Sequence, residues 1–307
     1  RFLAVAQSDG LAPMRYPHVL VEPVNTGFQS GYDFDGDGEP GDPGDAWGFG
    51  HYPGQYGMAV YSRFPIDREG LRTFRELRWA TMPGHHMPDG RDGRPAWYSA
   101  DEAAAFRLSS KSHWDVPIRV DGHALHLLAS HPTPPVFDGD EDRNGRRNFD
   151  EIRLWADYLT GGEAASYLID DQGRPGGLDP KSAFVLLGDL NADPVRGETF
   201  DGRPAIAQLL DHPRIQDPRQ QSPGERAGIG RDGRPYPGDA RTLTSGFGRI
   251  DYALPSTGLR VLASGVFWPP SDDPLHALVE GNDRASDHQL VWVDLAWPPD
   301  DTATDTP

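Results

Sequence analysis

A carboxylate and an amide follow an apolar run near the middle of the chain, in the segment FVLLGDLNADP, residues 184–194. The apolar run predicts a buried strand, so Asp189 and Asn191, two positions apart, point the same way where the strand ends. At the rim of an α/β sheet such a pair can hold a metal ion or orient a water molecule. The alternative is an ordinary Asp-X-Asn turn that ends the strand.

Two further carboxylates and a histidine lie in or before other apolar runs. Asp287 and His288 come just before the final apolar run, and because adjacent residues of an extended segment face opposite sides, they serve different partners. Asp251 is a lone carboxylate in the apolar segment RIDY, where a buried charge is costly unless it is paired. A histidine is the natural partner for Asp251.

His131 ends another apolar run, HALHLLAS, and is followed by the stiff segment PTPP. A single histidine there is more often a structural hydrogen-bonder than a catalyst. Side chains of this kind at four strand ends are harder to dismiss as structural: His131, Asp189 with Asn191, Asp251, and Asp287 with His288.

Short apolar runs bounded by turn residues predict the elements that position these side chains. The expected strands are residues 18–24, 57–63, 73–79, 118–131 with a hairpin turn at Asp121-Gly122, 184–187, 250–254, 259–267 and 289–295. Helices are expected over 149–159, capped by Asn148, and over 205–210. Residues 25–56 and 218–241 are expected to be loops, the second of them mobile.

The composition limits the number of domains and the kinds of protein to which this chain can belong. No polar linker divides the 307 residues, so residues 1–297 are expected to form one α/β domain and residues 298–307 a flexible tail. The net charge of −18 disfavours a broad, nonspecific grip on nucleic acid or anionic membrane. The absence of cysteine excludes disulfides, thiolate metal sites and a cysteine nucleophile. No apolar run reaches the length of about 18 residues typical of a membrane span.

Asp33, Asp35 and Asp37 place carboxylates at alternate positions, like the start of a calcium-binding loop. The twelfth position of that loop is Gly44 rather than Glu, which excludes an EF-hand. Either the loop binds Ca²⁺, with further ligands from Asp42 and Asp45, or it is a solvated acidic loop.

Taken in order, His131 and the motifs GDLNADP, RIDY and SDH resemble the endonuclease/exonuclease/phosphatase superfamily of metal-dependent phosphoesterases. The resemblance covers residues 19–295, and GMAVYSRFPI, residues 57–66, looks like another strand of the superfamily. It implies a four-layered α/β sandwich with two central mixed β-sheets flanked by helices.

The resemblance also implies roles for the polar residues. His288 would activate or orient the attacking water, and Asp251 would fix its tautomer. Asp189 and Asn191 would position the water and the phosphate, while His131 would stabilise charge on the phosphate oxygens.

Mg²⁺ or Mn²⁺ is the implied cofactor, with Asp287, Asp189 and Asn191 as ligands. Candidate phosphate-binding residues are three arginines expected just before the 149–159 helix and two residues of the segment SSKSHWDVP: Arg143, Arg146, Arg147, Lys111 and His113. One departure concerns the start of the chain, because the superfamily carries an Asn and a metal-binding Glu on its first two strands and no such pair precedes Val19. We therefore expect the N-terminal strands to be missing and this form to be weakly active or inactive.

The favoured hypothesis is a phosphoesterase acting outside the cytoplasm, extracellular or periplasmic, on a phosphodiester or a phosphomonoester. Its substrate is a small molecule, a lipid headgroup or a nucleic acid, the last corresponding to a secreted nuclease with arginines 219–234 as further contacts. The alternative is a non-catalytic binding module that keeps the fold. No feature of the sequence indicates a protein partner.

Overall fold

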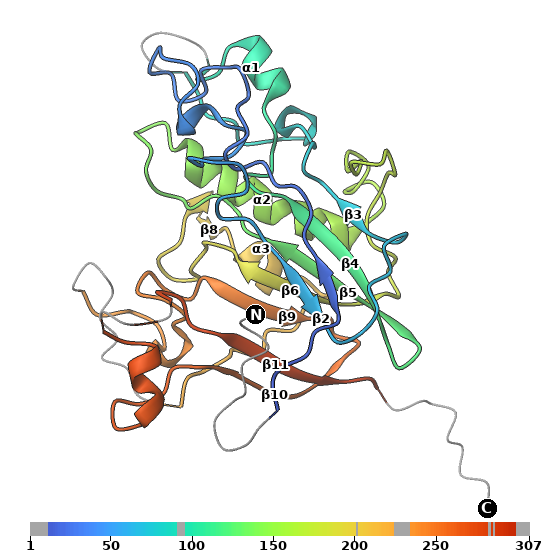
Figure 1. Ribbon diagram of the computed structural model, residues 1–307. Coiled ribbons are helices and arrows are strands. Elements are labelled where there is room, and N and C mark those ends of the chain that lie inside the picture. Colours follow the sequence, from blue (N-terminus) through green and yellow to red (C-terminus); the bar gives the residue numbers. More distant parts are fainter. Residues whose placement is uncertain are drawn as a thin grey trace, which may run out of the picture.

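The computed structural model describes residues 12–90, 96–200, 202–223, 234–281, 284 and 286–298. A five-stranded mixed sheet lies at its centre, in the order β3-β4-β5-β6-β9 (Figure 1). Its strands are β3 (Arg72–Thr73), β4 (His113–Val120), β5 (His123–Ser130), β6 (Ala183–Asp189) and β9 (Asp251–Pro255).

Strands β4 and β5 form the predicted hairpin, and its turn residues Asp121 and Gly122 have φ angles of 51° and 85°. Strand β6 runs parallel to β5, while β9 runs antiparallel to β6 and pairs Asp251 with Asp189. Parallel neighbours end at the same edge of a sheet, so His131, just after β5, and Asp189, at the end of β6, come to one rim. The start of β9 brings Asp251 to the same rim.

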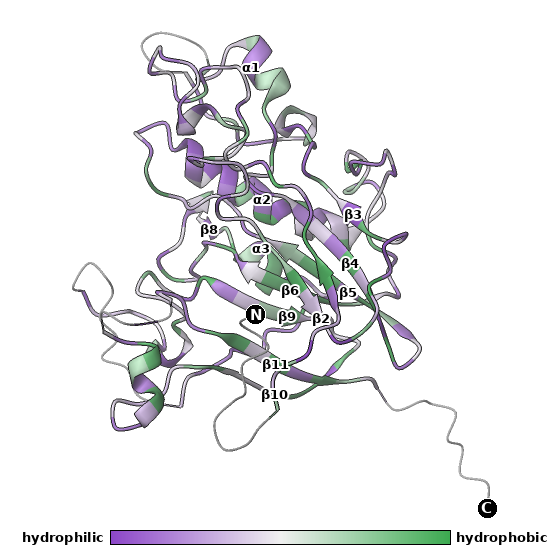
Figure 2. Ribbon diagram, in the orientation of Figure 1, coloured by the Kyte–Doolittle hydropathy of each residue, from purple (hydrophilic) through white to green (hydrophobic). Residues whose placement is uncertain are grey.

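Helices α2 (Arg143–Thr160) and α3 (Ala207–Leu210) cover one face of the central sheet. Figure 2 shows hydrophobic residues concentrated on β5 and β6, and the core between these strands and α2 includes Leu154, Trp155 and Tyr158. Trp155 is fully buried, and its indole Nε1 donates to Ser130 Oγ at 2.9 Å. This bond ties the helix to the strand that precedes His131.

The other face of the sheet packs against a short pair of strands, β1 (His18–Leu20) and β2 (Val60–Ser62). Leu20 and Val24 contact Trp114 and Val116 of β4 in this second core. A further pair, β10 (Arg260–Val266) and β11 (Val291–Ala296), contacts β9 through β11. The α/β class with mixed sheets is confirmed, and among the described residues β1-β2 and β10-β11 are two separate two-stranded sheets.

The remaining elements are short. They are the helix α1 (Ala100–Ala105), the strands β7 (Thr199–Phe200) and β8 (Arg203–Pro204), and 3-10 turns at Pro43–Asp45, Trp79–Thr81, Ala240–Thr242 and Pro274–Leu278. The expected loop over 25–56 is confirmed apart from one such turn. Much of the expected mobile loop (224–233) and most of the expected tail (299–307) lie outside the described residues. Where the chain is described, no helix has the length and apolar character that crossing a membrane requires.

Several expected boundaries differ from the structure, most of all those of one strand and one helix. The expected strand over 73–79 is reduced to β3, which ends at Thr73, followed by a 3-10 turn at Trp79. The long helix begins at Arg143, and Asn148 lies inside it, where the amide donates to Thr133 O and Leu190 O. The first turns of α2 carry polar residues that loops bury, so the apolar period by itself marked the helix too late.

Candidate active site

Asp189 and Asp251 face each other at the rim of the central sheet. Asp189 is the last residue of β6 and Asp251 the first of β9, and the two are paired in register. Gly188 allows the neighbouring strand to come close, because a Cβ at this position would lie 2.0 Å from Ser130 O. A larger residue at 188 would force the end of β5, and His131 after it, away from Asp189.

His288 completes a group of three ionisable side chains. Its Nδ1 lies 2.9 Å and 3.0 Å from the two oxygens of Asp251 and 3.9 Å from Asp189 Oδ2. Thr244 Oγ1 donates to Asp251 Oδ2 at 2.7 Å, which holds the carboxylate in place. Because Nδ1 is engaged by Asp251, Nε2 is the ring nitrogen that remains for a water molecule or substrate.

The charges of this group are strongly coupled. The hydrogen bond to Asp251 raises the pKa of His288 to about 9. Burial, followed by the negative charge of Asp251, raises the pKa of Asp189 to about 6. Two carboxylates held together at a half-buried rim are stabilised by positive charge, so the group attracts a cation.

The donor set fits a divalent metal ion. Asp189, Asp251 and His288 each offer a ligand atom, and these atoms lie within 4.8 Å of one another. Asn191 donates from Nδ2 to Pro132 O at 3.1 Å, which leaves its Oδ1 as a further oxygen donor. Carboxylate and amide oxygens are the ligands that Mg²⁺ and Mn²⁺ prefer.

Asp287 does not belong to this group. Its side chain is exposed, and among the described residues the gathered ligand atoms come from Asp189, Asp251 and His288 instead. Adjacent residues of the extended segment before β11 face opposite ways, so turning His288 to the rim turns Asp287 toward solvent. Its implied role as a metal ligand stays a prediction.

His131 and Lys111 lie beside Asp189. His131 Nε2 is 3.5 Å from Asp189 Oδ2, and burial, with the nearby Lys111 charge, lowers the pKa of His131 well below its ordinary value. Lys111 is buried; its Nζ donates to Pro132 O at 3.2 Å, and burial lowers its pKa to about 8. The rim thus carries a neutral imidazole next to a buried ammonium group.

The other candidate phosphate-binding residues have partners of their own. The three arginines lie in the first two turns of α2 rather than before it: Arg143 pairs with Glu141, Arg146 with Asp89 at 3.5 Å, and Arg147 donates to the carbonyls of Trp47, Arg107 and Leu108. His113 is fully buried, with its ring nitrogens 2.7 Å from Ser109 Oγ and 2.9 Å from Glu151 O. Burial lowers the pKa of His113 to about 4, as for a structural histidine.

The acidic loop gathers carboxylates as the sequence predicted. Ligand atoms of Asp33, Asp35 and Asp37 lie within 4.8 Å of one another, and so do those of Asp35 with Asp42 and Asp45. These carboxylates also accept hydrogen bonds from backbone amides; Asp45, for example, accepts from Phe34 N and Gly41 N, both at 2.7 Å. The loop is therefore held by its own turns, and Ca²⁺ binding stays a prediction.

No sequence pattern indicated two of the residues that position the site. Thr244 belongs to a Gly- and Ser-rich stretch, and its bond to Asp251 depends on how distant segments meet. Glu151, on the buried side of α2, accepts from Ser110 N and Thr133 N at 2.6 Å each. These bonds hold Ser110, next to Lys111, and Thr133, two residues after His131. A glutamate in a helix is ordinarily expected to be exposed to solvent, so this structural role was not predicted.

Replacing Asp251 by asparagine should lower the pKa of His288 from about 9 toward the ordinary histidine value. The raised pKa means that the pair stabilises the fold fully below about pH 6.5 and loses this contribution as pH rises through 9. The variant should lack that pH-dependent stability. The measurement is a titration of the His288 ring by ¹⁵N NMR in EDTA.

The matched control is Asp287→Asn, which removes an exposed carboxylate that contributes least to the shift. It should leave the pKa of His288 nearly unchanged. An unchanged pKa in Asp251→Asn would contradict the pairing of these two residues.

Comparisons with known proteins relate the chain to one protein family. A family model described as "Endonuclease/Exonuclease/phosphatase family" matches residues 6–288. No curated protein matches the chain. A solved endonuclease/exonuclease/phosphatase from Beutenbergia cavernae is 18% identical with a TM-score of 0.50, over 92% of this chain and 54% of its own length, so this chain spans about half of that protein.

Two other solved structures are more distant. Sphingomyelinase C from Streptomyces griseocarneus is 14% identical with a TM-score of 0.34, over 79% of this chain and 64% of its own. A mannosyl-6-phosphatase from Bacteroides thetaiotaomicron is 12% identical with a TM-score of 0.37, over 78% of this chain and 70% of its own.

Proposed function

The chain belongs to the endonuclease/exonuclease/phosphatase family, and we propose that it is a divalent-metal-dependent phosphoesterase in which water attacks phosphorus at the rim of the central sheet. The observation that carries this proposal is the contact between His288 Nδ1 and Asp251, with Asp189 3.9 Å from the same nitrogen. An oriented imidazole beside a second carboxylate is what a water-activating site requires.

Asp251 orients the imidazole. Because its carboxylate accepts from Nδ1, the proton stays on that nitrogen and Nε2 is free to take a proton from water. The pKa of about 9 applies to His288 when no cation offsets the negative charges of Asp189 and Asp251. With a cation held at Asp189, that negative charge would be offset and His288 would favour the neutral imidazole, which is the form that acts as a base.

The phosphoryl oxygens are bound by three side chains, those of Lys111, Asn191 and His131. The Lys111 ammonium has one hydrogen-bond acceptor in the described residues, Pro132 O, so its other N–H groups can meet phosphoryl oxygens as negative charge develops there. His131 is neutral, given its lowered pKa, and contributes a hydrogen bond rather than a positive charge.

Mg²⁺ or Mn²⁺ would be held by Asp189 and Asn191, while His288, paired with Asp251, is kept for the water. When bound, such an ion polarises a phosphoryl oxygen and compensates the charge of the phosphate. Residues 1–297 are proposed to form the single catalytic domain, acting outside the cytoplasm, as the composition favours.

A small phosphoester or a lipid headgroup suits this site better than nucleic acid. The net charge is −18, and the arginines at the start of α2 are engaged by Glu141, Asp89 and backbone carbonyls. A nucleic-acid cutter instead depends on free cations along the phosphate backbone and weakens steeply as salt is added.

The test is release of p-nitrophenol from bis(p-nitrophenyl) phosphate and from p-nitrophenyl phosphate, with Mg²⁺ or Mn²⁺ and after addition of EDTA. It is run on this chain and on a form extended upstream, because the family's first metal ligand lies on an N-terminal strand. Metal-dependent release in either form supports a phosphoesterase, and the preferred ester distinguishes diester from monoester chemistry. If folded, metal-loaded protein releases nothing in both forms, the binding module is the better account.

A further inference from the structure

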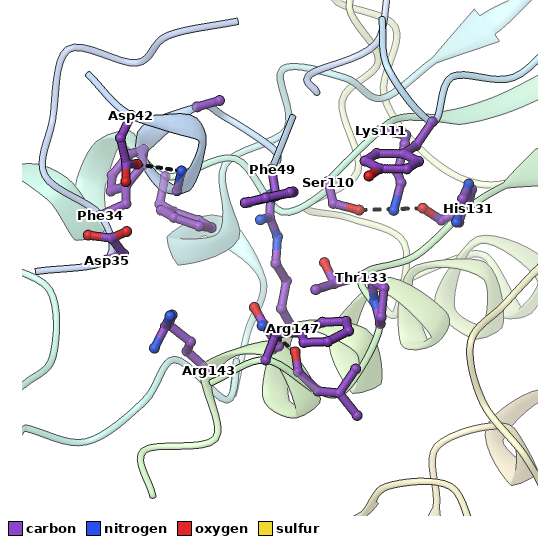
Figure 3. Close-up of a pocket in the computed structure, with 18 of the residues that line it drawn as sticks. Phe34, Asp35, Asp42, Phe49, Ser110, Lys111, His131, Thr133, Arg143 and Arg147 are labelled. Atoms are coloured by element: carbon purple, nitrogen blue, oxygen red, sulfur yellow. Dashed lines mark hydrogen bonds between the residues drawn. The ribbon is translucent and has the colours of Figure 1, made fainter. Parts of the chain in front are cut away.

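A cavity of about 450 Å³ opens directly beside the proposed phosphate position. His131 and Lys111 line one side of it, Asp35 and Asp42 line the opposite side, and Phe49 lies between them (Figure 3). Its volume lies within the range of small-molecule sites, roughly 300–1,000 Å³. The cavity is therefore continuous with the site and large enough for an organic group bonded to the phosphate.

The inner wall of the cavity is aromatic. Phe34, Tyr98 and Phe106 line it and pack on one another, with ring centroids 4.4 Å apart for Phe34 and Phe106 and 4.8 Å for Tyr98 and Phe106. All three are buried, so the wall is fixed by the core behind it. A rigid aromatic wall favours a ligand with a flat or compact apolar body.

The outer lining adds apolar side chains that solvent reaches. Phe49, Tyr56, Val136 and Phe137 line the cavity with exposures of 54%, 50%, 47% and 87%. Large apolar side chains that converge on one cavity while exposed to water commonly mark a binding surface.

Two of these residues also have unusual backbones. Tyr56 and Phe137 have φ angles of 61° and 69°, in the left-handed region that aromatic residues rarely occupy. Such a conformation costs on the order of 1 kcal/mol, and residues that keep it cluster at ligand sites. The strained backbones of Tyr56 and Phe137 place both rings at one cavity. A loop with only a structural role would not need this conformation.

Several of the charged groups that line the cavity are engaged by partners within the protein. Arg147 donates to three backbone carbonyls, Arg143 pairs with Glu141, and Asp42 accepts from the amide of Gly44. Lys111, in contrast, keeps N–H groups without an acceptor in the described residues. Lys111 is thus the lining cation that can still meet a phosphate, and Asp35 and Asp42 lie on the opposite side of the cavity.

We propose that this cavity binds the organic substituent of the phosphoester, and that this substituent is a compact aromatic or similarly flat apolar group, with its phosphate at Lys111 and His131. The inference rests on the proposed function, because it places the phosphate at that site. It commits the substrate to one class: a phosphoester of a ring-bearing alcohol or phenol.

Binding of two non-hydrolysable probes tests this class without turnover. Calorimetry compares 1-naphthylmethylphosphonate with methylphosphonate, with and without Mg²⁺. Burial of the naphthyl ring against the aromatic wall should make the first bind on the order of tenfold more tightly. Phe49→Ala and Phe137→Gly should reduce that preference to within about twofold and leave methylphosphonate binding unchanged.

Phe137→Gly suits the left-handed backbone, so this variant should keep the melting temperature and still lose the preference. Tyr61→Ala, which removes a ring of 52% exposure outside the cavity, is the matched control and should bind like the wild type. Any one of three results would overturn the proposal. These are equal affinity for the two probes, no binding of the naphthyl probe, and a preference for the naphthyl probe that persists in both Phe49→Ala and Phe137→Gly. Failure of the ester hydrolysis assay would instead count against the proposed function, since probe binding needs no reaction.

Discussion

Replacing His288 by alanine is expected to lower kcat/KM for bis(p-nitrophenyl) phosphate by about 10²- to 10⁴-fold, the usual worth of a positioned general base. The imidazole is oriented by Asp251 at 2.9 Å, and in the described residues no other histidine contacts both carboxylates of the rim. Its loss therefore leaves the attacking water without a base. Steady-state rates in saturating Mn²⁺ measure the effect.

The control is His123→Ala, which removes an exposed histidine at the far end of β5. It should retain the wild-type rate. If His288→Ala retained more than half of the wild-type activity while remaining folded, the role assigned to His288 would be wrong.

Replacing Asp189 by asparagine is expected to abolish most metal-dependent activity and yet to stabilise the metal-free protein. Asp189 is held beside Asp251 at a half-buried rim, and its raised pKa shows that its negative charge is unfavourable there. Removing that charge should raise stability by on the order of 1 kcal/mol, or roughly 2 °C in melting temperature. A gain in stability with a loss of activity is typical of a charge retained for function.

Thermal unfolding in EDTA and in Mg²⁺ measures this effect. Mg²⁺ should raise the melting temperature of the wild type, because an ion that binds the folded state stabilises it. In Asp189→Asn the increase should be much smaller. A variant that melts below the wild type in EDTA, or that Mg²⁺ stabilises equally, would contradict the charge cluster described for the rim.

The positions of the site residues in the fold followed largely from the sequence. Short apolar runs and turn residues predicted the hairpin of β4 and β5, and β6 before Asp189, because strand ends depend on local signals. The link between Asp251 and a histidine followed from the cost of an unpaired carboxylate in an apolar segment. These are rules that operate on neighbouring residues.

What the sequence did not predict depends on contacts between distant segments. The early start of α2 is hidden because its first turns bury Arg147 and Asn148 against backbone carbonyls. The exclusion of Asp287 from the ligand group depends on which face of the segment before β11 meets the rim. The cavity lined by Phe49 and Phe137 is built from loops, whose conformations carry little periodic signal.

The most direct test of the central claim is hydrolysis of bis(p-nitrophenyl) phosphate in ¹⁸O-labelled water with Mn²⁺, using whichever of the two forms of the chain is active. Attack of water on phosphorus predicts that the p-nitrophenyl phosphate product carries one ¹⁸O, that the phenol carries none, and that His288→Ala loses the labelled product. Unlabelled phosphate product from the wild type, or the same yield of labelled product from His288→Ala, would contradict the account.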